Sequence, residues 1–393
     1  MKVLIVPDSF KSTLSSVRVA EIISDVFKSD GFETHSAPIG DGGEGTVDAL
    51  LYSLGGEKKY LEVLDSLGRQ INTYYGMKDK TAFMEISGSA GLMLLKESEY
   101  DPSRTSTFGF GQMIEDAVKK GAGKIYLGLG GTATNDAGIG MLSALGVRFY
   151  DKAGDEIRGL LCGSVLEKIG KIESKNLLAG LKDVEFTVIS DVQNPLTGKY
   201  GATKIFSPQK GADSLMVEML EKGMVNYASI LNRDYSTDTE FPGAGAAGGA
   251  GASLKVFLNA KINPGIECVV NLLALERNIA ESDLIIVGEG SLDYQSAFGK
   301  APVGIARIAK KYNKKVIAVA GKLGENAESL YAEGIDLIFS YYGNVNINLG
   351  YIKMHSEKLL KETAALAKDI IKTNPELKNR KYICYETKNL YNA

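Results

Sequence analysis

The sequence has little of the residues on which much enzyme chemistry depends: 393 residues contain no tryptophan, two histidines and three cysteines. His35 and His355 each lack a metal-binding partner or a glycine-elbow serine nearby, which excludes zinc chemistry and histidine-based hydrolysis. Cys162, Cys268 and Cys384 are odd in number and far apart, so we expect reduced structural thiols rather than disulfides or a zinc site.

A strong excess of charge and a long apolar run are also missing. The 45 Lys and Arg residues against 48 Asp and Glu give a net charge of −3, which excludes the basic field that a nucleic-acid backbone requires. No apolar run approaches the roughly 20 residues needed to span a bilayer, and Met1 to Asp8 turns polar too early for a secretory signal. We expect a cytoplasmic protein with no nucleic-acid or membrane partner; whether it forms a homo-oligomer stays open.

What the sequence does contain is a repeated strand and helix pattern. Hydrophobic residues make up 44% of the chain, enough for a sizeable core, and the length predicts two or three domains. Short apolar strands with polar or glycine-rich tips alternate with segments of helical periodicity in both terminal thirds, which predicts parallel α/β layers. The predicted strands include residues 2–6, 33–38, 124–129, 184–189, 284–287 and 315–320.

One glycine-rich stretch, Gly128-Leu-Gly-Gly-Thr-Ala-Thr-Asn-Asp136, joins a predicted strand to a predicted helix. Gly130 and Gly131 let the backbone approach a bound group, and the free N–H groups of the next helix favour anions. The polar side chains that follow suit phosphate oxygens, a hydroxylated substrate or Mg²⁺: Thr132, Thr134, Asn135 and Asp136. The alternative is a glycine-rich turn whose polar residues cap the helix.

Other strand tips carry similar side chains. In parallel sheets, ligands bind outside the carboxyl ends of the strands, so residues far apart in sequence can share one cleft. The candidates are Asp8, Lys11, Asp41, Asn135, Asp136, Asp191, Asn194, Glu289 and Asp293. Any single one is more often a cap or turn residue, but their recurrence at strand tips favours a site. Gln209 and Lys210 follow Pro208, and Lys210 is a candidate phosphate ligand.

The segment with the most biased composition runs from Pro242 to Ser253 and is rich in glycine and alanine. Its Gly243, Gly245 and Gly248 satisfy the dinucleotide-binding pattern G-x-G-x-x-G. No buried strand precedes these glycines, so the context that gives the pattern its meaning is missing. They either line a close approach to substrate or nucleotide or serve close packing. No G-x-x-x-x-G-K-[ST] loop is present. The carboxylates, amides, lysines and glycine loops that remain are the groups that phosphoryl transfer requires.

The motifs also resemble a known family. Pro7-Asp-Ser-Phe-Lys11, the Gly128 stretch and Gly288-Glu-Gly-Ser-Leu-Asp293 are similar to the bacterial type I glycerate kinases, as are four further motifs: Gly40-Asp-Gly-Gly-Glu-Gly-Thr46, Asp191-Val-Gln-Asn-Pro-Leu196, Pro208-Gln-Lys-Gly-Ala212 and Pro242-Gly-Ala-Gly-Ala-Ala-Gly-Gly249. The resemblance covers about residues 2–372. It implies ATP-dependent phosphorylation of D-glycerate, with 2-phosphoglycerate favoured over 3-phosphoglycerate as the product.

The resemblance also implies a domain organisation. We expect a flavodoxin-like parallel-sheet domain of residues 1–60 and 275–372, with 122–146 as a further candidate part of it. A second α/β domain, 61–274, is inserted into it, and the active site lies between the two. Residues 373–393 form a C-terminal extension of unknown role.

From these motifs we expect Asp191 to be the base for the glycerate hydroxyl, with Asn194 orienting it. Glu289 and Asp293 are expected to hold Mg²⁺ or its waters. Asp8 and Lys11 are two further expected catalytic residues, and Lys11 and Lys210 are expected to hold the glycerate carboxylate or the ATP phosphates. The expected residues that bind substrate or nucleotide are Asp41, Gly130, Gly131, Thr132, Thr134, Asn135, Asp136, Gln209, Lys210, Gly243, Gly245, Gly248 and Lys300. Ser291 stands where the family commonly has Arg, and Lys300 is the residue that could compensate.

Two other classes of function stay open. One is a nicotinamide-dependent oxidoreductase, supported only by the pattern at Gly243 to Gly248. The other is a non-catalytic sensor of a hydroxy acid that signals through the C-terminal extension. The first predicts use of a nicotinamide cofactor and the second predicts ligand binding without turnover.

Overall fold

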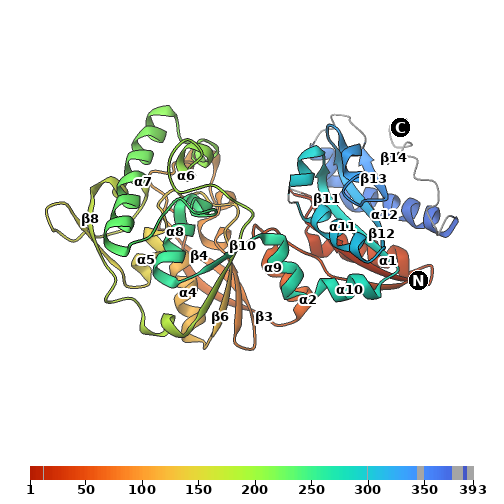
Figure 1. Ribbon diagram of the computed structural model, residues 1–393, viewed down its shortest axis with the longest axis horizontal. Helices are drawn as coiled ribbons and strands as arrows, with labels where there is room; N and C mark the ends of the chain where they lie inside the picture. The colour runs from red at the N-terminus through yellow and green to blue at the C-terminus, as the bar shows by residue number, and fades with distance from the viewer. Residues whose placement is uncertain (12, 299, 343–348, 374–383, 387–393) are drawn as a thin grey trace. The chain divides into compact units, whose positions relative to one another are not determined.

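The computed structural model describes residues 1–11, 13–298, 300–342, 349–373 and 384–386 (Figure 1). Internal contacts divide the chain into two compact units. The first unit comprises Met1–Asp41, Asp48–Gly55 and Ile266–Ala393, and the second comprises Gly42–Val47 and Gly56–Gly265. Residues 122–146 lie in the second unit.

The first unit is built on a six-stranded sheet in which every neighbouring pair is parallel. Its order is β14-β13-β12-β11-β1-β2. Without the short β14, the strands taken in chain order form the sequence 2-1-3-4-5, which is the flavodoxin-like order. The predicted parallel α/β fold is therefore confirmed. The strands are β1 (Lys2–Pro7), β2 (Glu33–Ser36), β11 (Leu284–Leu292), β12 (Lys315–Leu323), β13 (Leu337–Tyr342) and β14 (Cys384–Glu386).

Helices cover both faces of this sheet (Figure 1). Helices α1 and α12 pack with Val3 and Ile5 in one core, whereas Leu4 and Val6 are buried on the opposite face, where α11 contacts β1, β11 and β12. The side chain of Ser15 accepts a hydrogen bond from the Arg18 amide and so caps α1. The helices are α1 (Ser16–Lys28), α2 (Thr46–Leu54), α9 (Gly265–Leu272), α10 (Leu275–Glu281), α11 (Ala301–Lys311) and α12 (Leu349–Thr373).

The second unit has a mixed sheet of order β10-β9-β6-β5-β4-β3. The pairs from β10 to β5 are parallel and those from β5 to β3 are antiparallel, so β3, β4 and β5 form two successive hairpins. Strands β7 (Arg148–Asp151) and β8 (Ile169–Glu173) form a separate hairpin. The sheet strands are β3 (Glu57–Leu64), β4 (Gln70–Lys78), β5 (Thr81–Glu85), β6 (Lys124–Gly128), β9 (Glu185–Ile189) and β10 (Lys261–Asn263).

A second hydrophobic core lies within this unit, between the sheet and its helices. Ile125, Leu127 and Val188 of the sheet pack with Met113 of α4 and Leu254 of α8. Short 3-10 turns complete the connections. The helices are α3 (Ser87–Ala90), α4 (Phe108–Lys119), α5 (Ile139–Ala144), α6 (Ala202–Phe206), α7 (Ser214–Tyr235) and α8 (Ala246–Leu258).

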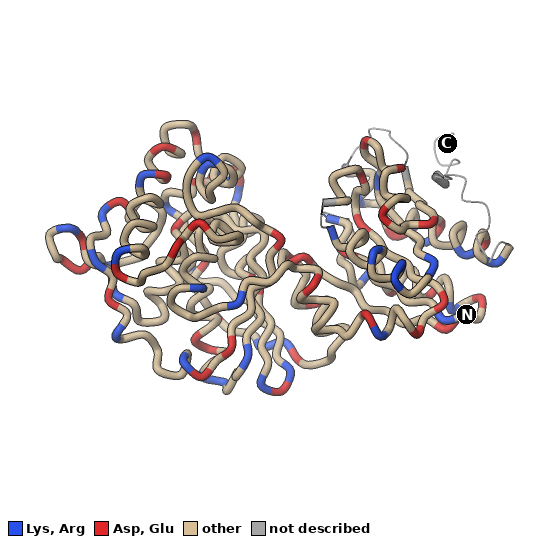
Figure 2. Tube along the Cα trace, viewed as in Figure 1, with Lys and Arg blue, Asp and Glu red and all other residues tan. Residues whose placement is uncertain are grey.

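Charge, hydrophobicity and cysteine placement along the chain are unexceptional for a folded α/β protein. Lysine and arginine are interspersed with aspartate and glutamate along the trace (Figure 2). Within the described residues, no helix combines the length and apolar character needed to cross a membrane. Cys162 is partly buried and Cys268 is buried. Most of the C-terminal extension lies outside the described residues, but its Cys384–Glu386 segment forms β14, beside β13.

Candidate active site

The first group of candidate residues lies at the carboxyl ends of β1 and β11. From β1 the chain runs to β2 on one side, whereas β11 leads to β12 and β13 on the other, so the strand order reverses between these two strands. Such a switch point is where open α/β sheets bind ligands. Pro7 pairs with Gly288 in the parallel register. Asp8 and Glu289, the next residues after this pair, therefore lie side by side.

The Asp8 carboxylate is buried close to other negative charges, which disfavours its ionised form. Asp8 is only 7% exposed, and the Ser9 amide donates a 2.6 Å hydrogen bond to its carboxylate. Burial, reinforced by the negative charges of Asp41 and Glu289, raises the Asp8 pKa to about 7. Lys11 donates to Asp41 at 3.2 Å, and the charge of Asp41 raises the Lys11 pKa. The group thus holds more negative than positive charge near Asp8.

Glu289 is paired with the lysine that follows in the same motif. The Lys300 ammonium donates to Glu289 Oε1 at 2.8 Å and to the Ser291 carbonyl at 3.3 Å. Burial raises the Glu289 pKa, and the hydrogen bond from Lys300 opposes that rise. Among the described residues, the other oxygen, Glu289 Oε2, is buried and accepts no hydrogen bond. An acceptor left in this state favours a bound cation, water or ligand donor.

These residues fit a hard divalent cation in the way kinases hold magnesium. Mg²⁺ in such sites takes one or two carboxylates, with substrate phosphates and water completing the coordination. Glu289 and Asp8 supply such carboxylates. The Asp293 carboxylate instead accepts from the Ser296 amide at 3.2 Å. The described residues contain no cluster of three or more acidic, histidine or cysteine side chains placed to enclose a metal by themselves.

In the second unit, glycines allow two loops to touch. The Gly130 amide donates to the Gly42 carbonyl at 2.9 Å. A Cβ on Gly128 would lie 2.5 Å from the Gly42 oxygen, and one on Gly130 would lie 2.6 Å from the Gly43 Cα. Gly42 in turn packs on the end of β9, where its Cβ would lie 2.2 Å from the Ile189 oxygen. The 42–47 loop therefore lies across the tips of β6 and β9.

Asp136 is buried completely and organises the strand-to-helix turn. Its carboxylate accepts from the Thr107 amide and hydroxyl, both at 2.8 Å, and from the amides of Gly138 and Gly140 at 3.1 and 3.3 Å. Burial raises the Asp136 pKa, and these hydrogen bonds oppose the rise. Such bonding fixes the starts of α4 and α5. Direct contact of Asp136 with a ligand stays a prediction.

Lys210 is the buried cation of the second unit. It is 3% exposed and donates to Thr132 Oγ1 at 3.1 Å and to the Thr134 carbonyl at 2.6 Å. Burial lowers the Lys210 pKa to about 8, against the charge of Asp136. Gln209, in contrast, is exposed. Lys210 therefore lies beside the Thr132 motif in space, and the ligand that it binds stays a prediction.

Several polar atoms of the segments that Lys210 joins are buried without a hydrogen-bond partner among the described residues. Asn135 donates to Thr203 Oγ1 at 3.1 Å, but its carbonyl oxygen is buried without a hydrogen bond. The hydroxyls of Thr134 and Ser207 are also buried and unbonded. Unpaired buried groups of this kind are costly, by roughly 1–3 kcal/mol each, so the same region is suited to a polar ligand or ordered water.

Asp191 and Asn194 follow β9 and are held by backbone contacts. Asp191 is exposed and its Oδ1 accepts from the Gly265 amide at 2.7 Å. Asn194 donates to the Tyr200 carbonyl at 2.8 Å. These contacts orient both side chains, and their roles as base and orienting group stay predictions.

The glycines of the dinucleotide-like pattern are buried against the chain itself. A Cβ would lie 2.4 Å from the Pro195 oxygen at Gly245 and 2.1 Å from the Thr134 oxygen at Gly248. No strand of the described chain lies between α7 and α8, so the strand-turn-helix context of a dinucleotide site is absent there. Close packing, one of the two expected explanations, accounts for Gly243, Gly245 and Gly248 in the structure; nucleotide contact stays a prediction.

Sequence reasoning missed Glu85, at the end of β5. Its carboxylate accepts from the amides of Gly45 and Val47 at 3.2 and 2.6 Å and from the Ser87 hydroxyl at 3.3 Å. The signal was available, because Glu85 is an acidic residue at a strand tip like Asp8 and Asp191. Thr203, the partner of Asn135, had no such signal.

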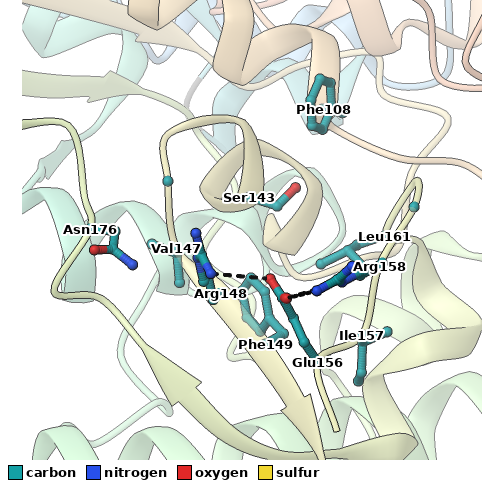
Figure 3. Close-up of a pocket in the computed structure, with 12 residues that line it drawn as sticks. Phe108, Ser143, Val147, Arg148, Phe149, Glu156, Ile157, Arg158, Leu161 and Asn176 are labelled. Atoms are coloured by element: carbon teal, nitrogen blue, oxygen red, sulfur yellow. Dashed lines mark hydrogen bonds and ion pairs between the residues drawn. The ribbon is translucent and has the colours of Figure 1, made fainter.

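A separate hollow of about 390 Å³ lies in the second unit beside the β7–β8 hairpin (Figure 3). Glu156 bridges Arg148 and Arg158 there, at 3.7 and 3.0 Å. Phe108, Ser143 and Asn176 line the same hollow. None of the predicted site residues lines it, so it is distinct from the groups described above.

Comparison with known proteins assigns this arrangement to a family. The model of the glycerate kinase family matches residues 3–372. The chain is 41% identical over 345 residues to the glycerate 2-kinase of Escherichia coli K12, covering 86% of this chain and 90% of the relative. It is 42% identical to a glycerate kinase of Bacillus cereus, with the same coverage.

A solved structure agrees in fold. The crystal structure of a Salmonella typhimurium LT2 protein, provisionally assigned as glycerate kinase 2, superposes with a TM-score of 0.84 at 38% identity, covering 95% of this chain and 99% of that one. The chain belongs to the glycerate kinase family. It is a phosphotransferase with an alcohol group as acceptor, and the predicted class of enzyme is confirmed.

Proposed function

We propose that this enzyme transfers the γ-phosphoryl group of ATP to the 2-hydroxyl of D-glycerate, giving 2-phosphoglycerate and ADP. The observation that carries the proposal is the charged cluster of Asp8, Asp41, Glu289, Lys11 and Lys300 around the switch point of the first sheet. Such a set suits a nucleotide polyphosphate with its metal, because phosphoryl transfer depends on positioning and charge neutralisation.

Glu289 and Asp8 are the residues that would hold Mg²⁺ in this cluster, and Asp293 would contact its waters. The ion supplies neutralisation of the phosphate charge that develops during transfer. Lys11 and Lys300 provide positive charge from the chain itself. Lys300 lies beside the Ser291 carbonyl, and it would supply a cation near the position where the family commonly has Arg.

On the acceptor side, Lys210 would bind the glycerate carboxylate. Its ammonium makes two hydrogen bonds within the described residues, and its third N–H would donate to the ligand. The unbonded hydroxyl of Thr134 and carbonyl of Asn135 would bind the hydroxyl groups of the same three-carbon acid. Asp41 and the glycine loops at Gly130–Gly131 and Gly243–Gly248 would complete the nucleotide and substrate contacts, with Gln209 at the edge.

Asp191 is the proposed base. As the glycerate 2-hydroxyl attacks, the bond between the γ-phosphorus and its bridging oxygen breaks, a new phosphorus–oxygen bond forms, and Asp191 accepts the hydroxyl proton. The hydrogen bond from Gly265 to Oδ1 supports this role because it fixes the carboxylate plane, and Asn194 would orient the attacking hydroxyl. We place the reaction in the cytoplasm.

The test is a substrate panel. Purified protein with Mg²⁺ and ATP is incubated with D-glycerate, L-glycerate, lactate and other small hydroxy acids, and ADP release is followed. The proposal expects ADP release that depends on D-glycerate. An oxidoreductase would instead change nicotinamide absorbance without consuming ATP, and a sensor would show thermal stabilisation by the acid with no ADP release; either result contradicts the proposal.

A further inference from the structure

Two carboxylates of the second unit hold the chain at the points where it leaves that unit. Val47 is the last residue of the segment Gly42–Val47, and Gly265 is the last residue of the segment Gly56–Gly265. Each of these residues donates its amide to a carboxylate: Val47 to Glu85 at 2.6 Å, and Gly265 to Asp191 at 2.7 Å.

Both contacts lie in the first turn of a helix. Val47 is the second residue of α2, and Gly265 is the first residue of α9. The first N–H groups of a helix have no partner inside it, and a carboxylate there satisfies them and complements the positive end of the helix dipole. The first turns of α2 and α9 are therefore capped by Glu85, at the end of β5, and by Asp191, which follows β9.

The Glu85 contact also places a loop. The second oxygen of its carboxylate accepts from Gly45, so one side chain holds two amides of the 42–47 loop. That loop lies on the β6 tip through the Gly130–Gly42 hydrogen bond. Ser87 donates to the same carboxylate at 3.3 Å and fixes it from the β5 side. The loop is thus held from two neighbouring strands.

From these contacts we propose that Glu85 is a positioning residue of the reaction, paired with Asp191, and that the two carboxylates fix the starts of α2 and α9 and the path of the 42–47 loop. Glu85 touches no reacting atom in this account. Asp191 carries the anchoring role in addition to the proton transfer proposed above. The kinetic part of the inference rests on the proposed function, whereas its structural part does not.

The direct test is amide hydrogen exchange by NMR on the full-length protein. Glu85→Ala removes both acceptors, so exchange at Gly45 and Val47 is expected to accelerate at least about tenfold, while Gly265 stays protected as an internal control. Glu85→Gln keeps one oxygen acceptor and replaces the other with an NH2 donor, so one of the two amides is expected to stay within about threefold of wild type while the other accelerates. Asp191→Ala should accelerate Gly265 alone.

Kinetics separate anchoring from proton transfer. Glu85→Ala is expected to lower kcat about tenfold and Glu85→Gln to restore it in part, because the amide oxygen keeps one of the two loop contacts. Asp191→Asn keeps an oxygen that can cap α9, so the Gly265 amide stays protected. Low turnover in that variant therefore reports on the base and not on the anchor.

If Glu85→Ala fails to fold, Glu85→Asp, shorter by one methylene, should show the same exchange increase in weaker form. Unchanged exchange at Gly45 and Val47, or equal kinetics of the Ala and Gln variants, would overturn the proposal.

Discussion

The main-chain amide of Asp8 donates a 2.9 Å hydrogen bond to the carbonyl oxygen of Gly288. This bond extends the pairing of β1 with β11 by one residue, beyond Pro7. It brings Asp8 next to the strand that carries Glu289, although the two acids are far apart in sequence. The acidic centre of the first unit is thus a direct product of parallel register at the switch point.

The buried Asp8 predicts a particular pH dependence of stability. An acid whose pKa is higher in the folded protein than in the unfolded chain binds its proton more tightly when folded. The contribution of Asp8 to the free energy of unfolding is complete below the ordinary pKa of 3.8 and is lost as the pH rises to about 7.

Asp8→Asn should therefore be more stable than wild type at pH 8, by roughly 2–4 kcal/mol, with little difference at pH 4. Urea unfolding at both pH values measures this, with Asp25→Asn on the exposed face of α1 as control. Equal stability of Asp8→Asn and wild type at pH 8 would show that Asp8 ionises without penalty.

Lys300 and Glu289 should be energetically coupled. Lys300→Met leaves a buried carboxylate without its 2.8 Å partner, so we expect the free energy of unfolding to fall by roughly 2 kcal/mol. Adding Glu289→Gln removes the stranded charge and should recover at least about half of that loss. Chemical denaturation of the two single variants and the double variant forms a complete cycle. Simple additivity of the two single effects would mean that the ion pair does not matter to the fold.

Lys210 should control the affinity for the acid substrate. Losing a buried charged hydrogen-bond donor costs about 1.5–3 kcal/mol, so Lys210→Met should raise the KM for D-glycerate roughly ten- to a hundredfold. In the wild type, kcat/KM for glycerate should fall as the pH rises through about 8, where the ammonium loses its proton. That decline should vanish in the variant. Lys204→Met, on the exposed side of α6, is the matched control. A KM that rises for ATP and not for glycerate would contradict this assignment.

The glycine run at α8 should be intolerant of a single methyl group. Gly248 has a φ of +64°, and an added Cβ would lie 2.1 Å from the Thr134 oxygen. Gly121 also has a positive φ, +88°, but nothing lies within 4 Å of its Cβ position. Gly121→Ala should thus cost only the backbone strain, about 1–2 kcal/mol, whereas Gly248→Ala should cost at least about 3 kcal/mol. Thermal unfolding of the two variants compares them. Equal destabilisation would mean that the loops separate easily and that packing does not explain the glycine pattern.

Much of the fold followed from local pattern. The apolar run of β1 and the helical spacing of Val19, Ile22, Ile23 and Val26 in α1 are both visible in the sequence, because burial on one face imposes that spacing. Strand β10 was missed because its three residues are too few to show a period. Helix α8 was missed for another reason: glycine and alanine carry no apolar stripe, and its contacts depend on a distant loop.

The sequence allowed the residues of the candidate site to be predicted, but not the hydrogen bonds that those residues make with one another. Acid residues at strand tips could be located from the sequence, and Asp8 and Glu289 do follow adjacent strands. The engagement of Asp136 with Thr107 could not be foreseen, because that hydrogen bond joins segments whose approach depends on packing of α4 against α5. The same holds for Lys210 and Thr132, which meet across the tertiary fold.

The most direct test of the central claim is the chemical identity of the product. Phosphorus NMR of a reaction containing the protein, ATP, Mg²⁺ and D-glycerate should show 2-phosphoglycerate and ADP appearing in equal amounts. Asp191→Asn, confirmed as folded, should slow this conversion at least about a hundredfold if Asp191 is the base. Formation of 3-phosphoglycerate would contradict the proposed acceptor oxygen. Near wild-type turnover by the variant would contradict the proposed base. The absence of any phosphorylated glycerate would contradict the account as a whole.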